Sequence, residues 1–343
     1  MSLARRSSLL ALAAVVALPM LAAACGSDDG AATTTTGADG GDTSAAFPVV
    51  IQHQFGTTEV PEEPQRVVSV GFTEQDDLLA LGVTPVGIRD WYGEQPFAVW
   101  PWATDELGDA EPEVLSAAEI DLEQVAALAP DLIVGISSGM DDQEYAQLSA
   151  IAPTLAQRDE FVEYGTPWQD QLSSIATALG RTEEAQRIIS EIDERFAQQR
   201  AQHPELEGAS AVVAYLNTDG GASAYSSADV RGRLLAAYGM EVPGEIDELA
   251  DDTFYTEISP ERLDLLDVDV LIWATDDEAA RATVEANPVY KGLDVTRGGR
   301  SIFIEDDVLV GAASFSSPLS LPLVLDDLTP LVTDALEGTD ADS

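Results

Sequence analysis

A short stretch of glycines and serines is the first candidate for chemistry in this 343-residue chain. The letters GISSG at residues 135–139 fit the pattern G-x-S-x-G and follow an apolar run that predicts a strand, as the nucleophile elbow of a serine hydrolase does. That chemistry needs a histidine base, and the chain has two histidines, His53 and His203. His53 precedes the first predicted strand of a sheet and His203 ends a long predicted helix, so neither follows a late strand. We therefore expect no enzyme and no catalytic residues, and we interpret residues 135–139 as a loop that lines a cleft, with a secreted serine hydrolase as the alternative.

Direct binding of a metal ion by protein side chains is also disfavoured. A carrier of bare zinc or manganese usually gathers several histidines with a carboxylate, whereas these two histidines lie at the edges of separate elements. Cys25 is the only cysteine, so neither a disulfide nor a thiolate metal site is expected. Haem, with tyrosine or histidine as an axial ligand, and cobalamin remain possible as bound groups.

The composition indicates a strongly acidic globular protein. Aspartate and glutamate number 62 against 16 lysines and arginines, which gives a formal net charge of −46. Such a chain would repel nucleic acid and anionic membrane surfaces, so both are excluded as partners. Apolar residues make up 45% of the sequence, enough for buried cores, and the length predicts two domains.

The first 46 residues are not expected to belong to the fold. Arg5 and Arg6 precede an apolar run too short to span a bilayer, and three alanines precede Cys25. This pattern is typical of a bacterial lipoprotein signal over residues 1–25, with Cys25 as the lipidation site, although its leucine lies one place further from Cys25 than is commonest. The alternative is an ordinary secretory signal followed by a stray cysteine. Residues 26–46 are small and polar and predict a flexible tether, so we expect an exported protein anchored by lipid to the outer face of a bacterial cytoplasmic membrane.

Strands and helices are predicted to alternate in the rest of the chain, which is typical of an α/β fold with parallel sheets. The predicted strands are 67–70, 83–88, 132–136, 153–155, 211–215, 268–273 and 301–304, and the predicted helices begin near 77 and span 142–150, 168–179, 231–238 and 322–336. Thr182–Gln202 carries apolar residues at helical spacing, with Thr182 expected as its N-cap and a proline after His203. About twenty residues of helix would be roughly 30 Å long, enough to cross a small domain.

One sequence unit occurs twice, on either side of this helix. Residues 119–134 and 257–272 align at a constant offset of 138, and each copy predicts a capped short helix, then an aspartate, then a buried strand. The repeat predicts two related lobes joined by a single long helix. The expected boundaries are 47–180 for the first lobe, 181–203 for the helix, 204–338 for the second lobe and 339–343 for an acidic tail.

The ordered set of these features resembles the substrate-binding proteins of ABC importers, in the class whose lobes are joined by a rigid helix. RVVSVGFTEQDDLLALGVTPVGI, YGTPWQDQ, DTFYTEISPERLDLLDVDVLIW and SFSSPLSLP are similar to the ferric-siderophore branch of that class. The resemblance implies a periplasmic-binding-protein fold with two Rossmann-like lobes. It also implies a ferric siderophore in the cleft between the lobes, with a membrane permease and its ATPase as partners.

Ligands of open α/β sheets lie outside the carboxyl ends of the strands, and the loops at those ends are rich in aromatic and hydroxyl groups here. A chelated ferric ion needs flat apolar faces and a few hydrogen bonds from the protein, not a protein metal site or cofactor. Few basic residues lie in these loops, mainly Arg89 and Arg231, so we expect a neutral or cationic chelate of the hydroxamate type. Any one of these rings could instead be core packing. The predicted ligand-binding residues are Phe72, Thr73, Trp91, Tyr92, Trp100, Trp102, Ser137, Ser138, Tyr164, Trp168, Tyr215, Asn217, Tyr225, Arg231, Phe254, Tyr255, Phe315 and Ser316.

Glu123 and Glu261 occupy equivalent places in the repeat, each in the first turn of a predicted helix. In the resembled family one glutamate on each lobe pairs with arginines of the permease, and these two positions match that pattern. Acidic residues also favour helix N-termini without any partner. We expect a monomer that docks on a two-fold permease through this pair.

Overall fold

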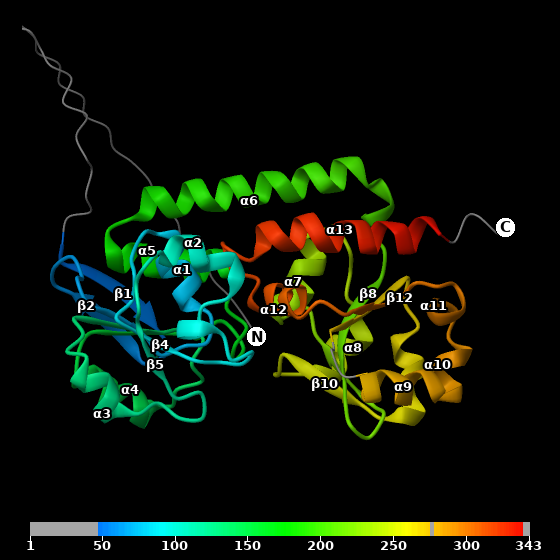
Figure 1. Ribbon diagram of the computed structural model, residues 1–343, viewed down its shortest axis with the longest axis horizontal. Coiled ribbons are helices and arrows are strands. Elements are labelled where there is room, and N and C mark those ends of the chain that lie inside the picture. Colours follow the sequence, from blue (N-terminus) through cyan, green and yellow to red (C-terminus); the bar gives the residue numbers. More distant parts are fainter. Residues whose placement is uncertain (1–46, 275–277, 339–343) are drawn as a thin grey trace, which may run out of the picture. The chain divides into compact units, whose positions relative to one another are not determined.

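The computed structural model describes residues 47–274 and 278–338, and shows two α/β lobes (Figure 1). The predicted signal with Cys25, the tether 26–46 and the tail 339–343 lie outside the described residues. The first lobe is built on a parallel sheet in the order β5-β4-β3-β6-β7. Its central strands β3 and β6 are buried throughout, because helices cover both faces. The strands are β3 (Val67–Ser69), β4 (Gly87–Arg89), β5 (Glu113–Leu115), β6 (Leu132–Gly135) and β7 (Thr154–Ala156), preceded by an antiparallel hairpin of β1 (Val49–His53) and β2 (Gly56–Val60).

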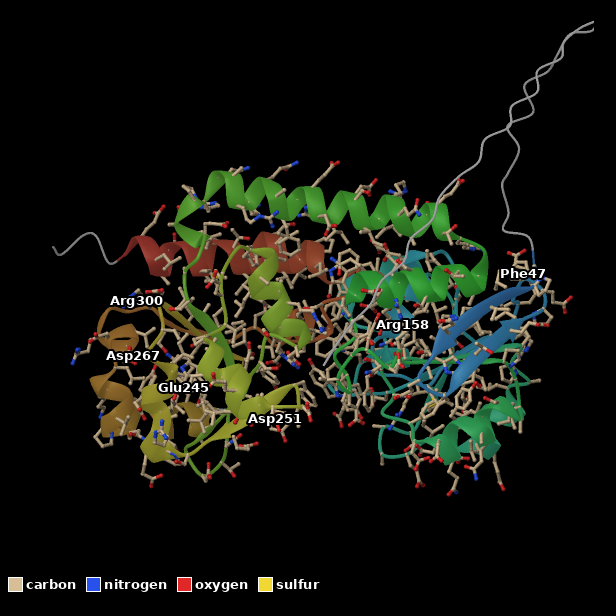
Figure 2. All side chains as sticks on the ribbon, turned by 180° about the vertical axis from the view of Figure 1, so that it is seen from behind. Phe47, Arg158, Glu245, Asp251, Asp267 and Arg300 are labelled. Carbon is tan, nitrogen blue, oxygen red and sulfur yellow. The ribbon has the colours of Figure 1, made fainter. Side chains whose placement is uncertain are left out.

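The helices of the first lobe follow its strands in the expected alternation. They are α1 (Glu74–Ala80), α2 (Thr104–Leu107), α3 (Leu122–Ala127), α4 (Asp142–Ser149) and α5 (Trp168–Leu179), with 3₁₀ turns at Pro96–Ala98 and Pro101–Ala103. The predicted strand over 83–88 is shorter than expected and begins at Gly87. Figure 2 shows Phe47 at the start of the described chain, next to the hairpin of β1 and β2.

The second lobe carries a mixed sheet in the order β10-β9-β8-β11-β12. β8, β11 and β12 are parallel, whereas β9 and β10 run antiparallel to their neighbours, a departure from the all-parallel expectation. In Figure 2, Asp267 and Arg300 lie on the outer side of this lobe, where Arg300 donates to the carbonyl oxygens of Val268 and Asp269. The strands are β8 (Ala211–Leu216), β9 (Ala222–Tyr225), β10 (Tyr255–Ile258), β11 (Val270–Ala274) and β12 (Ser301–Ile304).

Helices surround this second sheet and end the described chain. They are α7 (Val230–Ala237), α8 (Gly244–Ala250), α9 (Glu278–Ala286), α10 (Pro288–Gly292), α11 (Asp294–Arg297), α12 (Asp307–Phe315) and α13 (Leu321–Glu337), with 3₁₀ turns at Pro204–Leu206 and Pro260–Leu266. None of the helices in the described part of the chain combines the length and the apolar character needed to cross a membrane.

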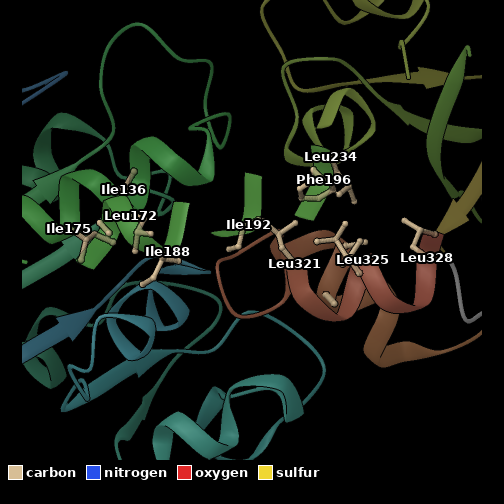
Figure 3. Close-up of a cluster of buried hydrophobic side chains, with 14 of the residues drawn as sticks. Ile136, Leu172, Ile175, Ile188, Ile192, Phe196, Leu234, Leu321, Leu325 and Leu328 are labelled. Carbon is tan, nitrogen blue, oxygen red and sulfur yellow. The ribbon is translucent and has the colours of Figure 1, made fainter. Parts of the chain in front are cut away.

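The long helix α6 (Thr182–Gln202) joins the two lobes and lies along both α5 and α13 (Figure 1). Its buried residues are Ala185, Ile188, Ile192 and Phe196, at helical spacing as predicted. They belong to one apolar cluster that also takes residues from α5, α7 and α13, drawn in Figure 3. The packing of α6 therefore links the cores of both lobes.

The start of α6 differs from the prediction. Thr182 is its first helical residue rather than its cap, and Arg181 in the N-cap position makes no side-chain capping bond. The Arg181 guanidinium instead donates to the carbonyl oxygen of Leu81 at the end of α1, at 2.6 Å. This contact ties the beginning of the long helix to the first lobe.

Two aspartates at equivalent positions of the internal repeat play the same structural part. Asp131, before β6, accepts hydrogen bonds from the backbone N–H groups of Gln65 and Arg66, which lead into β3. Asp269, before β11, accepts in the same way from the backbone N–H of Ser210, which leads into β8. Each aspartate thus fixes the entry of the neighbouring strand.

The short helices of the two copies are not alike. Asp121 caps α3 by accepting from the N–H groups of Glu123 and Gln124, whereas Ser259 makes no side-chain cap bond and the second copy is a 3₁₀ turn that begins at Pro260. Pro260 occupies the first position of this turn, where proline is favoured because an N–H group there has no partner within the helix.

Replacing Ile192 by alanine should reduce stability strongly, because its buried side chain fills the core beneath α6. We expect a loss of about 2–5 kcal/mol in the free energy of unfolding, measured by urea denaturation. Glu194→Ala, at an exposed position of the same helix, is the matched control and should change it by less than about 0.5 kcal/mol. Equal effects of the two substitutions would contradict the buried role of this face.

Candidate functional site

A cavity of about 220 Å³ lies between residues of the two lobes, and we refer to it as the cleft. Its first-lobe wall comes from the loops that follow β3, β4, β6 and β7, at the carboxyl edge of the parallel sheet, and from the start of α5. Its second-lobe wall comes from the end of β9, the start of α7, the residue before β10 and the end of α12. The lining residues are Phe72, Thr73, Trp91, Ser137, Tyr164, Thr166, Trp168, Gln171, Tyr225, Asp229, Val230, Arg231, Phe254, Ser314 and Phe315.

Aromatic rings from both lobes form a continuous wall of the cleft. Phe72 stacks on Trp91 with 5.5 Å between ring centroids and on Tyr164 at 6.1 Å. Trp91 reaches across to Phe315 of α12 at 5.4 Å, and Tyr164 meets Phe254 edge-on at 5.8 Å. These five rings offer flat apolar faces at little cost in side-chain entropy, which suits a rigid apolar or chelated ligand.

The charged side chains that line the cleft are one ion pair. Arg231 donates from Nη1 to both carboxylate oxygens of Asp229, at 2.9 and 3.1 Å, and its guanidinium lies 3.9 Å from the centroid of the Tyr225 ring. Burial alone would lower the pKa of Arg231, but Asp229 and Tyr225 more than offset this effect and its pKa is raised. The cleft therefore carries no net charge, although Nε of Arg231 is buried without a hydrogen-bond partner.

Arg89, the other cation expected near the cleft, supports the wall from behind and does not line the cavity. Its guanidinium lies 4.3 Å from the centroid of the Phe72 ring and donates to the carbonyl oxygens of Val70, Ala117 and Ser138. Burial lowers the pKa of this group. Arg89 thus holds three loops and one ring in place.

Two fully buried carboxylates of α1 position the polar part of the cleft. Glu74 accepts hydrogen bonds from the backbone N–H groups of Thr73 and Ser137, and Asp77 accepts from Nε2 of Gln171 at 2.7 Å. The same Gln171 nitrogen lies 3.1 Å from Oγ1 of Thr73. Burial raises the pKa of both carboxyl groups.

A third carboxylate of α1, Asp76, connects the two lobes. Its Oδ2 atom accepts from Nε1 of Trp102 at 2.8 Å and from Oγ of Ser317, in the turn between α12 and α13. Burial raises the pKa of Asp76 to about 6, although these two hydrogen bonds act in the opposite direction. Ser317 lies two residues after Phe315, so Asp76 helps to fix the ring that closes the cleft.

The structure brings ten of the eighteen predicted ligand-binding residues to the cleft. These are Phe72, Thr73, Trp91, Ser137, Tyr164, Trp168, Tyr225, Arg231, Phe254 and Phe315. Sequence reasoning missed five lining residues, namely Thr166, Gln171, Asp229, Val230 and Ser314. Gln171 lies three residues after Trp168 on α5, and this helical spacing was the available signal.

Five predicted residues lie behind or beside the lining, because they pack against the protein itself. Trp100 is buried and stacks on Trp102 at 4.9 Å, and Tyr92 meets Trp100 edge-on at 5.4 Å. Ser138 is buried and donates to the carbonyl oxygen of Gly135, and Ser316 is buried and donates to that of Ala313.

Tyr215, Asn217 and Tyr255 are not brought to the cleft lining. The chain turns back from β8 into the antiparallel strand β9, so Tyr215 and Asn217 belong to a hairpin instead of a strand-to-helix loop. Tyr215 is exposed, and Asn217 donates to the carboxylate of Glu257. Tyr255 pairs with Tyr225 across two strands and packs against Phe254 at 4.9 Å.

No histidine of the described chain contacts the serines of residues 135–139. His53 lies 3.0 Å from Thr58 Oγ1 and 3.2 Å from the Tyr145 hydroxyl, and His203 lies 3.0 Å from a carboxylate oxygen of Glu205. Among the described residues, no three histidine, cysteine, aspartate or glutamate side chains gather to hold a metal ion. Glu123 and Glu261 are both exposed and lie in the first turns of α3 and of the 3₁₀ turn at Pro260–Leu266.

A family model described as "Periplasmic binding protein" matches residues 67–308. The chain belongs to this family. The two open sheets and the single linking helix agree with this family and confirm the predicted class of fold. The family consists of substrate-binding transport proteins, which confirms the expectation that the chain is not an enzyme.

Solved structures and curated relatives of this binding protein agree with that membership. A periplasmic solute binding protein from Mycobacterium smegmatis is 40% identical, with 84% of this chain and 99% of that chain covered and a TM-score of 0.74. The Streptococcus pneumoniae protein PiaA, solved in complex with ferrichrome, is 25% identical over 84% of this chain and 99% of its own, with a TM-score of 0.75. A probable siderophore-binding lipoprotein of Bacillus subtilis, YfiY, is 27% identical over 85% of this chain and 90% of its own.

Replacing Asp76 by asparagine should change how stability depends on pH. Because the folded-state pKa lies above the usual 3.8, the native protein keeps a proton that the unfolded chain loses between about pH 4 and pH 6. The free energy of unfolding therefore falls as the pH rises through this range. Asp76→Asn removes this titration, so the free energy of unfolding of the variant relative to wild type should increase by about 2 kcal/mol from about pH 4 to about pH 7.

The measurement is chemical denaturation of both proteins across this pH range. Asp105→Asn, at an exposed position of α2, is the control and should leave the pH dependence of wild type unchanged. Glu74 and Asp77, whose pKa values are also raised, contribute to both proteins alike, so the test is the difference between them. A difference in the free energy of unfolding between Asp76→Asn and wild type that stays constant from about pH 4 to about pH 7 would show that Asp76 does not titrate in this range.

Proposed function

We propose that this binding protein is the extracytoplasmic component of an ABC importer and carries a ferric siderophore in the cleft. The observation that carries the proposal is the wall of five aromatic rings drawn from both lobes around a cavity with no net charge. A siderophore already saturates the coordination of its ferric ion, so the protein has to supply shape, apolar contact and a few hydrogen bonds. The relatives whose names refer to siderophore and ferrichrome binding support the same ligand class.

The size of the cleft indicates how the ligand would sit. Its volume of about 220 Å³ is below the roughly 300–1,000 Å³ of pockets that enclose most of a drug-sized ligand. We therefore expect a small rotation of the lobes about α6, or a chelate that stays partly exposed to solvent. A single helical connection favours small rotations over wide closure.

Both arginines near the cleft already bind other groups of the protein, which favours a neutral or cationic chelate of the hydroxamate type. Arg231 is paired with Asp229, and Arg89 donates to three backbone carbonyls. An anionic tris-catecholate or citrate complex would need several arginines with donors directed into the cleft. Nε of Arg231 is a buried cationic donor of the lining that has no partner in the described chain.

The remaining parts of the chain fit delivery from the membrane surface. Cys25 would carry the lipid anchor after removal of residues 1–24, and residues 26–46 would form the tether. We propose lobe boundaries at 47–180 and 204–338, with 181–203 as the linking helix and 339–343 as a tail. The protein would act as a monomer and dock on its permease through Glu123 and Glu261.

The ligand class can be tested by titrating the intrinsic tryptophan fluorescence with a ferric trihydroxamate and a ferric tris-catecholate. We expect tight binding of the trihydroxamate only, and a loss of about 30-fold in affinity for Trp91→Ala, whose ring joins the two lobes' aromatic walls. Tyr215→Ala, an exposed aromatic outside the cleft, should bind like wild type. Tight binding of the catecholate alone would overturn the assigned class.

The docking pair can be tested by uptake of labelled ferric chelate in cells. Charge reversal of both Glu123 and Glu261 to arginine should abolish uptake and leave ligand affinity unchanged, because both side chains are exposed and outside the cleft lining. The control reverses Glu59 and Glu245, which are also exposed and make the same change in net charge. Normal uptake by the Glu123/Glu261 variant would refute the docking role.

A further inference from the structure

A second cavity of about 410 Å³ lies beneath α6, and we refer to it as the rear pocket. It is formed by the start of α5, the second half of α6, one face of α7, the turn between α12 and α13, and the first residue of α13. Trp168 and Val230 line both the rear pocket and the cleft, so the two cavities share a wall. The remaining lining residues are Gln169, Asp193, Phe196, Arg200, Arg233, Leu234, Ala237, Ser316 and Leu321.

Apolar side chains make up much of the rear pocket. Trp168, Val230 and Ala237 are half-buried and present apolar surface to the cavity, with Trp168 and Val230 on the wall shared with the cleft. Phe196, Leu234 and Leu321 lie beneath them and are at most 3% exposed. A volume of this size is within the range of pockets that hold small organic molecules. The pocket can therefore accept a compact apolar body.

Two arginines that have no ion pair with any described carboxylate line the same pocket. One hydrogen bond to a backbone carbonyl is present for each: Arg233 donates to Gly165 and Arg200 donates to Ala237. Arg233 and Ala237 are one turn apart on α7, so both guanidinium groups lie along one wall. A guanidinium has five N–H donors, so most donors of each group are available to a ligand.

Most of the other arginines in the described chain are paired with carboxylates. Eight arginines of the described chain are ion-paired with carboxylates, as expected where acidic residues are in large excess. Three further unpaired arginines, Arg66, Arg89 and Arg181, donate to backbone carbonyls and do not line this pocket.

The helix that opens onto the rear pocket adds to its positive potential. α5 has twelve residues and begins at Trp168 without a side-chain cap, because Pro167 occupies the N-cap position. The positive end of its dipole favours an anion, and Asp170 in the first turn, paired with Arg158, already supplies one carboxylate there. Asp193 is the carboxylate of the lining, and it lies exposed at the edge, 3.4 Å from Nε2 of Gln169.

We propose that the rear pocket binds a small organic monoanion, a carboxylate carried on a compact apolar body. The carboxylate would accept hydrogen bonds from Arg200 and Arg233, and the body would pack on Trp168, Val230 and Ala237. Two cations against one exposed aspartate leave a net positive charge in the pocket, and the apolar walls favour an organic anion over a hydrated inorganic one. This site is separate from the cleft and does not depend on the identity of the transported ligand.

The test is isothermal titration of the mature chain at low ionic strength with three probes: 2-naphthoate, its neutral analogue 2-naphthamide, and inorganic phosphate. We expect 2-naphthoate to bind at least about tenfold more tightly than either other probe, since a charge-assisted pair of hydrogen bonds separates acid from amide. Equal binding of acid and amide would overturn the role of the arginines. Equal binding of phosphate would overturn the role of the apolar walls.

Single and double substitutions show where 2-naphthoate binds. Arg200→Gln and Arg233→Gln, singly and together, should each weaken 2-naphthoate binding, whereas Arg262→Gln, an exposed arginine outside the pocket, should not. Trp91→Ala alters only the cleft and should leave 2-naphthoate binding unchanged. Weakening by Trp91→Ala would place the probe in the cleft and overturn the proposal. If the double variant does not fold, the single variants and the contrast between acid and amide still decide the outcome.

Discussion

The packing of one face of α6 is the constraint on which the arrangement of the two lobes depends. Ile188, Ile192 and Phe196 are buried in a cluster that continues into α5 on one side and into α7 and α13 on the other. Wide separation of the lobes would expose this apolar surface to water, at a cost of about 25 cal/mol for each Å². The hydrogen bond from Ser317 to Asp76 of α1 adds a polar contact between the two lobes. Together they hold the aromatic wall of the cleft largely assembled before a ligand arrives.

Three buried carboxyl groups near the cleft are expected to lower the stability of the folded protein. Three carboxyl groups, Glu74, Asp76 and Asp77, are fully buried on one short helix, and none forms an ion pair within the described chain. Each instead accepts hydrogen bonds from loops or side chains that shape the cleft. Buried polar groups that are satisfied in only one geometry restrict their neighbours to that geometry. The three carboxyl groups gather behind the cleft. Clusters of buried ionisable groups with shifted pKa values are typical of functional sites.

The sequence alone predicted the long-range architecture better than the short elements. α5 and α6 are found at the predicted positions because periodic apolar residues, a glycine and a proline bound them, and the repeated unit located β6 and β11. The hairpin of β1 and β2 and the antiparallel strands β9 and β10 were missed, because they are short and polar on one face. Aromatic loops identified the region of the cleft, yet Trp91 and Trp100 are alike in sequence context. Only the packing of Trp100 against Trp102 and α12 decides which ring is buried.

The ion pair of the cleft affects how fast a ligand associates with the protein. The surface carries a large negative charge, whereas Asp229 and Arg231 cancel each other inside the cleft. A cationic chelate would be drawn toward the protein by its long-range field, and an anionic one would be slowed before any contact forms. Discrimination by charge would then appear chiefly in the association rate constant, which added salt would lower for cations and raise for anions, while the dissociation rate would report the fit to the aromatic wall.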